Sequence, residues 1–276
     1  MRQRRHSPRV LAWRGVIAAL SDVAMASGIY PLLPHAALAL SRKPEEDRAA
    51  EAADAADRPS ALRIALREWR IAIEMSAARP LGFLPLPGEQ GRGPRPIILL
   101  HGYAMCRANF RPLARRLEAA GLGPVLGFEY WTLGKTSAAA KRLAEYVEEV
   151  RARSESDQVD IIGHSMGGVV GRYYVSLLGG DGAVANLITL GSPHAGTDVS
   201  AVGLGRPGKE LLGGSTLVQR LDAAPRPTRT RMTVVWSRAD ALVPGARHAR
   251  VTGVDELVYD DLGHLALLTD ERVAAA

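Results

Sequence analysis

The stretch Val159-Asp160-Ile161-Ile162-Gly163-His164-Ser165-Met166-Gly167-Gly168-Val169-Val170 joins two kinds of apolar sequence. Its first half is rich in β-branched residues and predicts a buried strand, and its second half continues into a predicted buried helix over residues 166–174. Gly-x-Ser-x-Gly at such a junction is typical of a sharp strand-to-helix turn. We expect Ser165 to adopt a strained backbone conformation that exposes its hydroxyl, with Gly163 and Gly167 leaving room across the turn. An ordinary glycine-containing turn is the alternative.

The backbone around this turn is suited to bind negative charge. Met166 begins the predicted helix, where N–H groups and the helix dipole favour a developing anion. Residues 96–103 predict a short strand that ends in His101-Gly102-Tyr103. Gly102 lets the chain bend, so that the Tyr103 amide would point towards Ser165. The Tyr103 and Met166 amides would then form a two-donor oxyanion hole for a tetrahedral acyl intermediate, unless His-Gly is an ordinary turn.

A reactive serine needs a histidine base and an acid that orients the histidine. In a strand–turn–helix topology of this kind the three follow one another in the order serine, acid, histidine. A strand predicted over residues 230–237 leads to Asp240, and the last strand, over residues 257–260, turns at Gly263 to present His264. Since each follows a strand end, we predict Asp240 as the acid and His264 as the base.

Other residues compete for these roles. The histidines after Ser165 are His194, His248 and His264. His248 stands between arginines before the last strand, where we expect a surface loop. Asp260 and Asp261 are close to His264 in the sequence and are interpreted as structural acids.

The chain after residue 96 alternates predicted strands and helices. Helices are expected at residues 109–120 and 137–153, and further strands at residues 124–130 and 184–190. Such alternation predicts an α/β fold with a mostly parallel central sheet and helices on both faces. Ligands of such sheets bind at the carboxyl ends of the strands. The glycine-rich segment 194–227, with a short helix at 215–221, is expected to be a cap or lid insert over those ends; an ungated surface loop is the alternative.

The first 40 residues have a basic leader followed by an apolar stretch. Residues 1–10 carry four arginines and no acid, and residues 15–40 contain one formal charge, Asp22. This pattern predicts a membrane-associated or signal-like segment. A helix lying on a membrane or docked on the domain, an inserted anchor and a cleaved signal remain alternatives. Localisation is accordingly predicted as membrane-associated or exported, with the cytoplasm as the alternative.

Residues 41–95 are expected to be a linker and an amphipathic helix that precede the main domain. Ser60 is a suitable cap for a helix that extends to residue 78. Its apolar stripe, Leu62, Leu66, Trp69 and Ile73, is expected to pack against the protein, with a lipid-facing role as the alternative. Residues 80–96 contain five prolines and four glycines, so we expect the domain boundary there, with the catalytic domain spanning residues 96–276.

Composition limits the other function classes. Hydrophobic residues make up 47% of the 276-residue chain, enough for a large α/β domain. The net charge is +6, but the excess arginine is scattered and is not interleaved with aromatics, so no nucleic-acid partner is predicted. An anionic membrane surface is equally compatible with this charge. A single cysteine, Cys106, excludes an internal disulfide and a multi-cysteine metal site.

Five motifs, taken in chain order, carry a resemblance to a known family. They are His101-Gly102-Tyr103, Gly163-His164-Ser165-Met166-Gly167-Gly168, Gly191-Ser192-Pro193-His194-Ala195-Gly196-Thr197, Ser237-Arg238-Ala239-Asp240 and Gly263-His264-Leu265. Together they resemble the bacterial triacylglycerol lipases and esterases of the α/β-hydrolase fold, over roughly residues 96–273. The N-terminal extension departs from the compact core of that family. A structural calcium, found in some relatives, cannot be assigned to residues here.

The resemblance implies a serine carboxylester hydrolase that cleaves lipid-like acyl esters without an organic cofactor or a catalytic metal. Ser165 would be the nucleophile, Asp240 and His264 its partners, and the Tyr103 and Met166 amides the oxyanion hole. A thioesterase, amidase, lactonase or acyltransferase that uses the same residues is the first alternative. A membrane-tethered scaffold without catalysis is the second, since a hydrolase fold does not by itself prove hydrolysis.

Overall fold

The structure of the protein, a computed structural model, describes residues 60–91, 93–198 and 205–276. The predicted membrane-associated or signal-like segment (1–40), the linker at 41–59 and residues 199–204 of the glycine-rich insert lie outside the described residues. Within the described part, no helix combines the length and the apolar character needed to cross a membrane.

The described strands form one parallel sheet in the order β2-β1-β3-β4-β5-β6. Each strand pairs in parallel with its neighbours. The strands are β1 Ile97–Leu100, β2 Val125–Phe128, β3 Val159–His164, β4 Val184–Leu190, β5 Arg231–Ser237 and β6 Asp255–Tyr259. This confirms the predicted parallel sheet, whose carboxyl ends lie along one edge.

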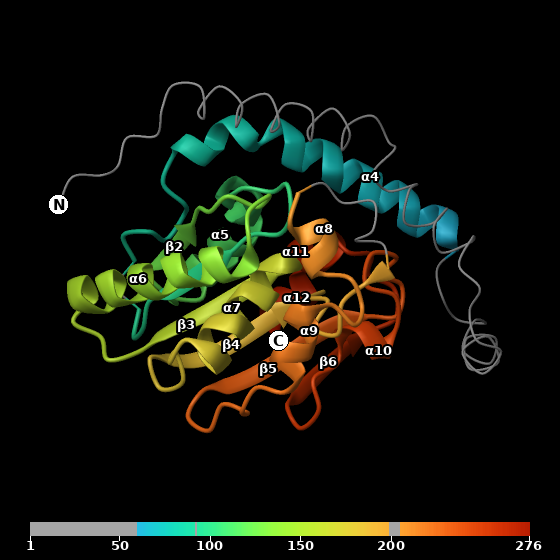
Figure 1. Cartoon of the computed structure of the whole chain (residues 1–276). Helices are drawn as coiled ribbons and strands as arrows, with labels where there is room; N and C mark the ends of the chain where they lie inside the picture. The colour runs from blue at the N-terminus through green and yellow to red at the C-terminus, as the bar shows by residue number, and fades with distance from the viewer. Residues whose placement is uncertain (1–59, 92, 199–204) are drawn as a thin grey trace, which may run out of the picture.

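Helices cover both faces of the sheet, as predicted (Figure 1). The α-helices are α4 Ala61–Ala77, α5 Arg111–Ala119, α6 Thr136–Ser154, α7 Met166–Leu177, α8 Pro207–Glu210, α9 Thr216–Asp222, α10 Ala246–Ala249, α11 Ala266–Thr269 and α12 Glu271–Ala275. Two 3₁₀ helices, η2 Arg79–Phe83 and η3 Arg107–Phe110, lie on either side of β1 in the sequence. The expected helix at residues 109–120 is therefore split into η3 and α5, with Pro112 at the start of α5.

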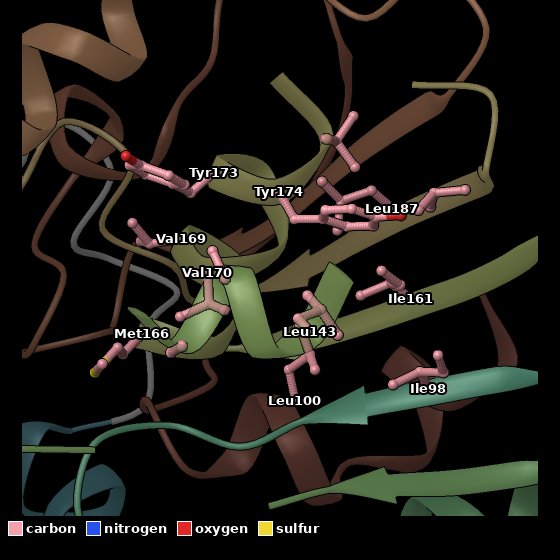
Figure 2. Packing of buried hydrophobic residues seen from close by; sticks show 14 of the residues in the cluster. Ile98, Leu100, Leu143, Ile161, Met166, Val169, Val170, Tyr173, Tyr174 and Leu187 are labelled. Atoms are coloured by element: carbon pink, nitrogen blue, oxygen red, sulfur yellow. The ribbon is translucent and has the colours of Figure 1, made fainter. Parts of the chain in front are cut away.

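The hydrophobic core has two layers because successive strand residues point to opposite faces. Ile98 and Leu100 of β1 belong to the layer under α6 and α7, whereas Ile97 and Leu99 belong to the layer under α4, α5 and α11. Figure 2 shows the first layer, which includes Leu143 of α6 and Leu100 of β1. Each fully buried Leu or Ile side chain contributes about 1.5–3 kcal/mol relative to exposure. The two layers hold the strand ends, and hence the site, in place.

Helix α4 begins where predicted but buries the opposite stripe. The Ser60 side chain caps it by accepting a hydrogen bond from the backbone N–H of Arg63. The expected packing stripe, Leu62, Leu66, Trp69 and Ile73, is exposed. The buried stripe is Ile64, Glu68, Ile71, Ala72 and Met75. At 100° per residue a two-residue offset turns the helix by about 200°, so the two stripes lie on opposite sides.

Helix α4 packs against the α/β body rather than standing apart from it. Its residues Ile71, Ala72 and Met75 share a core layer with α5 and α11, and α4 contacts α11 directly. Figure 1 shows α4 running along one side of the domain. The packed body therefore includes α4, which precedes the domain boundary expected at residues 80–96. A connection rich in proline and glycine does not prevent the helix before it from packing tightly.

The described parts of segment 194–227 contain the predicted short helix as α9, capped by Ser215. Leu217 and Leu221 of α9 join the core layer around α7. Contacts between α7 and α9 tie this half of the segment to the domain. Its role as a cap or lid stays a prediction.

Candidate active site

Ser165 lies in a sharp turn between β3 and α7. Its backbone has φ 55° and ψ −126°, a conformation that residues with a side chain rarely adopt. Ser165 N–H donates to the Leu190 carbonyl at 2.8 Å, which fixes the turn against β4. Residues 161–164 and 166–175 are buried, whereas Ser165 itself is half-buried. The strained turn therefore brings one hydroxyl out of an otherwise buried segment.

The two flanking glycines are required by close backbone contacts. A Cβ atom added to Gly163 would lie 2.5 Å from the backbone nitrogen of Gly168, across the turn. A Cβ atom on Gly167 would lie 2.1 Å from the carbonyl oxygen of Leu100, at the end of β1. Real Cβ atoms do not approach backbone so closely. The predicted reason, a collision across the turn, is confirmed for Gly163. The close contact of Gly167 is instead with the end of β1, which α7 approaches.

Asp240 and His264, the predicted acid and base, are hydrogen-bonded to each other. His264 Nδ1 lies 2.7 Å from Asp240 Oδ2, and both side chains are almost completely buried. The other Asp240 oxygen accepts the backbone N–H groups of Leu242 and Val243 at 2.8 and 3.0 Å. Because its oxygens are held in this way, Asp240 fixes the orientation of the imidazole ring.

Close contacts place this pair and Ser165 in one region at the strand ends. A Cβ atom on Gly191, directly after β4, would lie 3.0 Å from Asp240 Oδ2 and 3.2 Å from His264 Nδ1. His164, the residue before Ser165, has its ring centroid 4.8 Å from that of His264. Four loops, which follow β3, β4, β5 and β6, therefore meet at the same edge of the sheet.

The charge of the two neighbouring histidines is controlled by their surroundings. Burial lowers the pKa of His264, but the charge and hydrogen bond of Asp240 outweigh burial and leave this pKa raised. Burial, followed by the nearby His264, lowers the pKa of His164 to about 3. His164 is therefore neutral. Its Nε2 lies 3.0 Å from the His264 carbonyl oxygen, so Nε2 carries the proton and donates it to that carbonyl.

Of the two predicted oxyanion residues, Met166 directly follows Ser165, and Tyr103 belongs to a loop that passes the serine. Met166 is the first residue of α7, where an amide has no acceptor within the helix. A Cβ atom on Gly102 would lie 3.0 Å from Ser165 Cβ, so the His101-Gly102-Tyr103 loop runs past the serine. The next residue, Ala104, is held by Thr132 Oγ1, which accepts its N–H at 3.2 Å, and by the Arg79 guanidinium, which donates to its carbonyl at 2.7 Å. The loop is thus fixed from outside the site.

The competing histidines and acids have other roles. His248 is buried in α10, and its Nδ1 lies 2.7 Å from the Gly196 carbonyl, so the expected surface loop is wrong. His194 is buried with its Nε2 3.0 Å from Thr189 Oγ1. Asp260 and Asp261 pair with Arg238 and Arg272, which agrees with a structural role.

Sequence reasoning missed Glu68 of α4 as a residue of this region. Its carboxylate is buried and accepts the backbone N–H groups of Leu265 and Ala266, directly after His264. The sequence contains one signal for a buried role of Glu68. It lies four positions after Ile64 and three before Ile71, so it belongs to a helical stripe that is otherwise apolar.

Within the described residues, no three His, Cys, Asp or Glu side chains gather closely enough to hold a metal ion. The site instead combines the half-buried Ser165, the buried pair of Asp240 and His264, and the backbone amides at the start of α7. These are the parts that acyl transfer through a serine requires.

Comparisons with known proteins agree with this architecture. A family model described as the alpha/beta hydrolase fold matches residues 95–207. The structure is similar to a mature lipase of Bacillus licheniformis with a TM-score of 0.56 and 16% identity, covering 63% of this chain and 86% of that one. It is also similar to lipase B of Aspergillus fumigatus with a TM-score of 0.56 and 15% identity, covering 68% of this chain and 52% of that one.

The chain therefore has the alpha/beta hydrolase fold that its motifs predicted. It spans about half of the fungal lipase and most of the bacterial one. At 15–16% sequence identity, these similarities are evidence for the fold alone.

Proposed function

We propose that this protein is a serine carboxylester hydrolase that cleaves acyl esters, including lipid-like esters. The observation that carries the proposal is the buried 2.7 Å contact between Asp240 and His264, at the same sheet edge as the strained turn of Ser165. An acid–histidine pair at the same sheet edge as a half-buried serine on such a turn has the composition of a catalytic triad.

In the first half-reaction, His264 accepts the Ser165 proton as the serine oxygen attacks the ester carbonyl carbon. The carbonyl oxygen becomes negative in the tetrahedral intermediate and accepts hydrogen bonds from the Tyr103 and Met166 amides. Protonated His264, stabilised by Asp240, then donates the proton to the departing alkoxide oxygen. The alcohol leaves, and the acyl group remains on Ser165 as an ester.

In the second half-reaction, His264 removes a proton from a water molecule, whose oxygen attacks the acyl carbon. The same two amides hold the second oxyanion. As this intermediate collapses, the bond to Ser165 breaks and the serine oxygen recovers its proton from His264. A carboxylic acid is released, and the protein returns to its starting state.

The structural similarities support an ester as the substrate. The proteins of similar structure include lipases, with which the chain shares its overall fold. A lipid-like acyl chain is accordingly the substrate class that we propose.

A series of p-nitrophenyl esters of increasing acyl length tests the proposal. Wild-type protein should release p-nitrophenol, and Ser165→Ala should reduce kcat by a factor on the order of 10³ or more. Ser156→Ala is the matched control, because Ser156 Oγ donates to the Gln158 carbonyl before β3 and lies outside the site. The absence of hydrolysis at every length, or full activity in Ser165→Ala, would contradict the proposal.

A further inference from the structure

Glu68 of α4 reaches the turn that carries His264, although almost 200 residues separate them in the sequence. Its Oε2 accepts the Leu265 N–H at 2.8 Å and its Oε1 accepts the Ala266 N–H at 2.9 Å. A Cβ atom on Gly263 would lie 2.4 Å from Glu68 Cδ. Any other residue at position 263 would collide with the Glu68 carboxylate in its observed position.

The peptide bond that joins His264 to Leu265 is held at both ends. Its carbonyl oxygen accepts the Nε2–H of the neutral His164 at 3.0 Å. Its N–H donates to Glu68 at 2.8 Å. Fixing both polar groups of one peptide fixes the plane of that peptide, and the Cα atom of His264 is attached to it.

A second contact, one residue earlier on α4, ties the helix to the same C-terminal segment. Arg67 Nη2 lies 2.7 Å from Asp270 Oδ2. The Asp270 side chain is only 7% exposed, whereas that of Arg67 is 34% exposed, so this ion pair lies at the margin of the contact. Glu68 forms the buried part of a two-residue connection between α4 and the chain that follows His264.

We propose that Glu68 is a positioning residue for His264. Its carboxylate holds the turn so that the imidazole keeps its place between Asp240 and Ser165, and its negative charge stabilises the imidazolium that forms during acyl transfer. This inference rests on the proposed function. It means that a residue of α4, outside the sheet, helps to position His264.

The electrostatic surroundings support this role. The charged groups that act on Glu68 are His264, which favours its ionised form, and Asp240, which opposes it. Burial is the largest influence and raises the pKa of Glu68 to about 7, although the two backbone N–H groups counteract it. Glu68 in turn adds to the raised pKa of His264. The ionised form of each residue therefore stabilises the charged form of the other.

The Glu68→Gln variant tests this role, because it keeps the side-chain volume but removes the charge and one acceptor. We expect kcat for a p-nitrophenyl ester to fall by roughly 10- to 100-fold at unchanged KM, as for a displaced catalytic group. The acid limb of the kcat/KM profile should move to lower pH, since His264 loses a stabilising charge. Glu74→Gln is the matched control, because Glu74 lies on the same helix with a side chain that is 64% exposed.

Wild-type kcat together with an unchanged acid limb in Glu68→Gln would overturn the proposal. An equal loss in Glu74→Gln would also overturn it. Inactive wild-type protein would instead refute the proposed function, so the two failures are distinguishable.

If Glu68→Gln does not fold, Glu68→Asp provides a second test. It keeps the charge but withdraws the carboxylate by one methylene group, so one carboxylate can no longer reach both amides. We expect kcat to fall while the acid limb stays near its wild-type position. Wild-type kcat in Glu68→Asp would overturn the proposal.

Discussion

Replacing Glu68 by glutamine should make the free energy of unfolding depend less on pH. The pKa of Glu68 is raised from 4.5 to about 7 by burial. A carboxyl group with a raised pKa binds its proton more tightly in the folded state, so it stabilises the fold at low pH. This stabilisation is complete below about pH 4.5 and is lost as the pH rises through about 7.

The magnitude follows from the size of the shift. A difference of about 2.5 pH units, at about 1.36 kcal/mol per unit, corresponds to roughly 3 kcal/mol. His264 acts in the same direction, because its raised pKa also stabilises the fold at low pH and loses that effect as the pH rises through it. Glutamine does not titrate. The free energy of unfolding of Glu68→Gln relative to wild type should therefore rise by about 3 kcal/mol between pH 4.5 and 7.5.

Urea unfolding at a series of pH values, followed by circular dichroism, measures this difference. The constant cost of the lost acceptor in Glu68→Gln shifts all points equally, so the slope with pH is the informative quantity. Glu74→Gln is the matched control for the substitution, since Glu74 lies on the same helix with an exposed side chain. A flat difference in Glu68→Gln, or one that falls as the pH rises, would refute the reasoning.

Three further outcomes are expected. Asp240→Asn should lower kcat for p-nitrophenyl esters by about 10³–10⁴-fold, because the imidazole loses its orienting carboxylate; wild-type kcat would exclude this role. In urea unfolding, Ile71→Ala should cost about 2–4 kcal/mol and Leu66→Ala within about 0.5 kcal/mol, since Ile71 is 3% and Leu66 55% exposed; the reverse order would contradict the observed packing of α4. Gly167→Ala should unfold at lower urea concentration than wild type, because its Cβ would lie 2.1 Å from the Leu100 carbonyl oxygen; equal stability would contradict that contact.

Local patterns were sufficient to predict the sheet and the turn of Ser165. The apolar runs before Ser165 and Asp240 are short and bounded by glycine or polar residues, as buried parallel strands are. The run before His264 is also short but forms the edge strand β6, which is largely exposed. In a parallel sheet, residues that follow strand ends meet at one edge regardless of their separation in the sequence. The contact between Asp240 and His264 was therefore predictable without knowledge of any tertiary contact.

The orientation of α4 was not predictable from its own sequence. The helix carries two stripes with the same spacing, and the exposed one contains Leu66 and Trp69 while the buried one contains Glu68. By hydrophobicity alone the first stripe is the better candidate for burial. In the second stripe, the burial of Glu68 is compensated by two backbone N–H groups, those of Leu265 and Ala266, which donate to its carboxylate. Such a compensation depends on tertiary structure and leaves no local pattern.

His248 was misplaced for a related reason. It stands between arginines, which favour a surface loop, yet its ring is buried and contacts the Gly196 carbonyl. His248 is a buried residue of the short helix α10. Arg250, which follows this helix, forms an ion pair with Glu256 at the surface. Neighbouring charges predict the environment of a segment, but not of each side chain in it.

The most direct test of the central claim is the identity of the residue that a fluorophosphonate probe phosphonylates, because this reagent reacts with an activated serine oxygen and releases fluoride. Wild-type protein treated with a fluorophosphonate should gain one adduct, and peptide mapping by mass spectrometry should locate it on Ser165. Ser165→Ala should not be labelled, and Asp240→Asn should be labelled more slowly because His264 is a weaker base without its partner. An adduct on another residue, or labelling of Ser165→Ala at the wild-type rate, would contradict the assignment of Ser165 as the nucleophile.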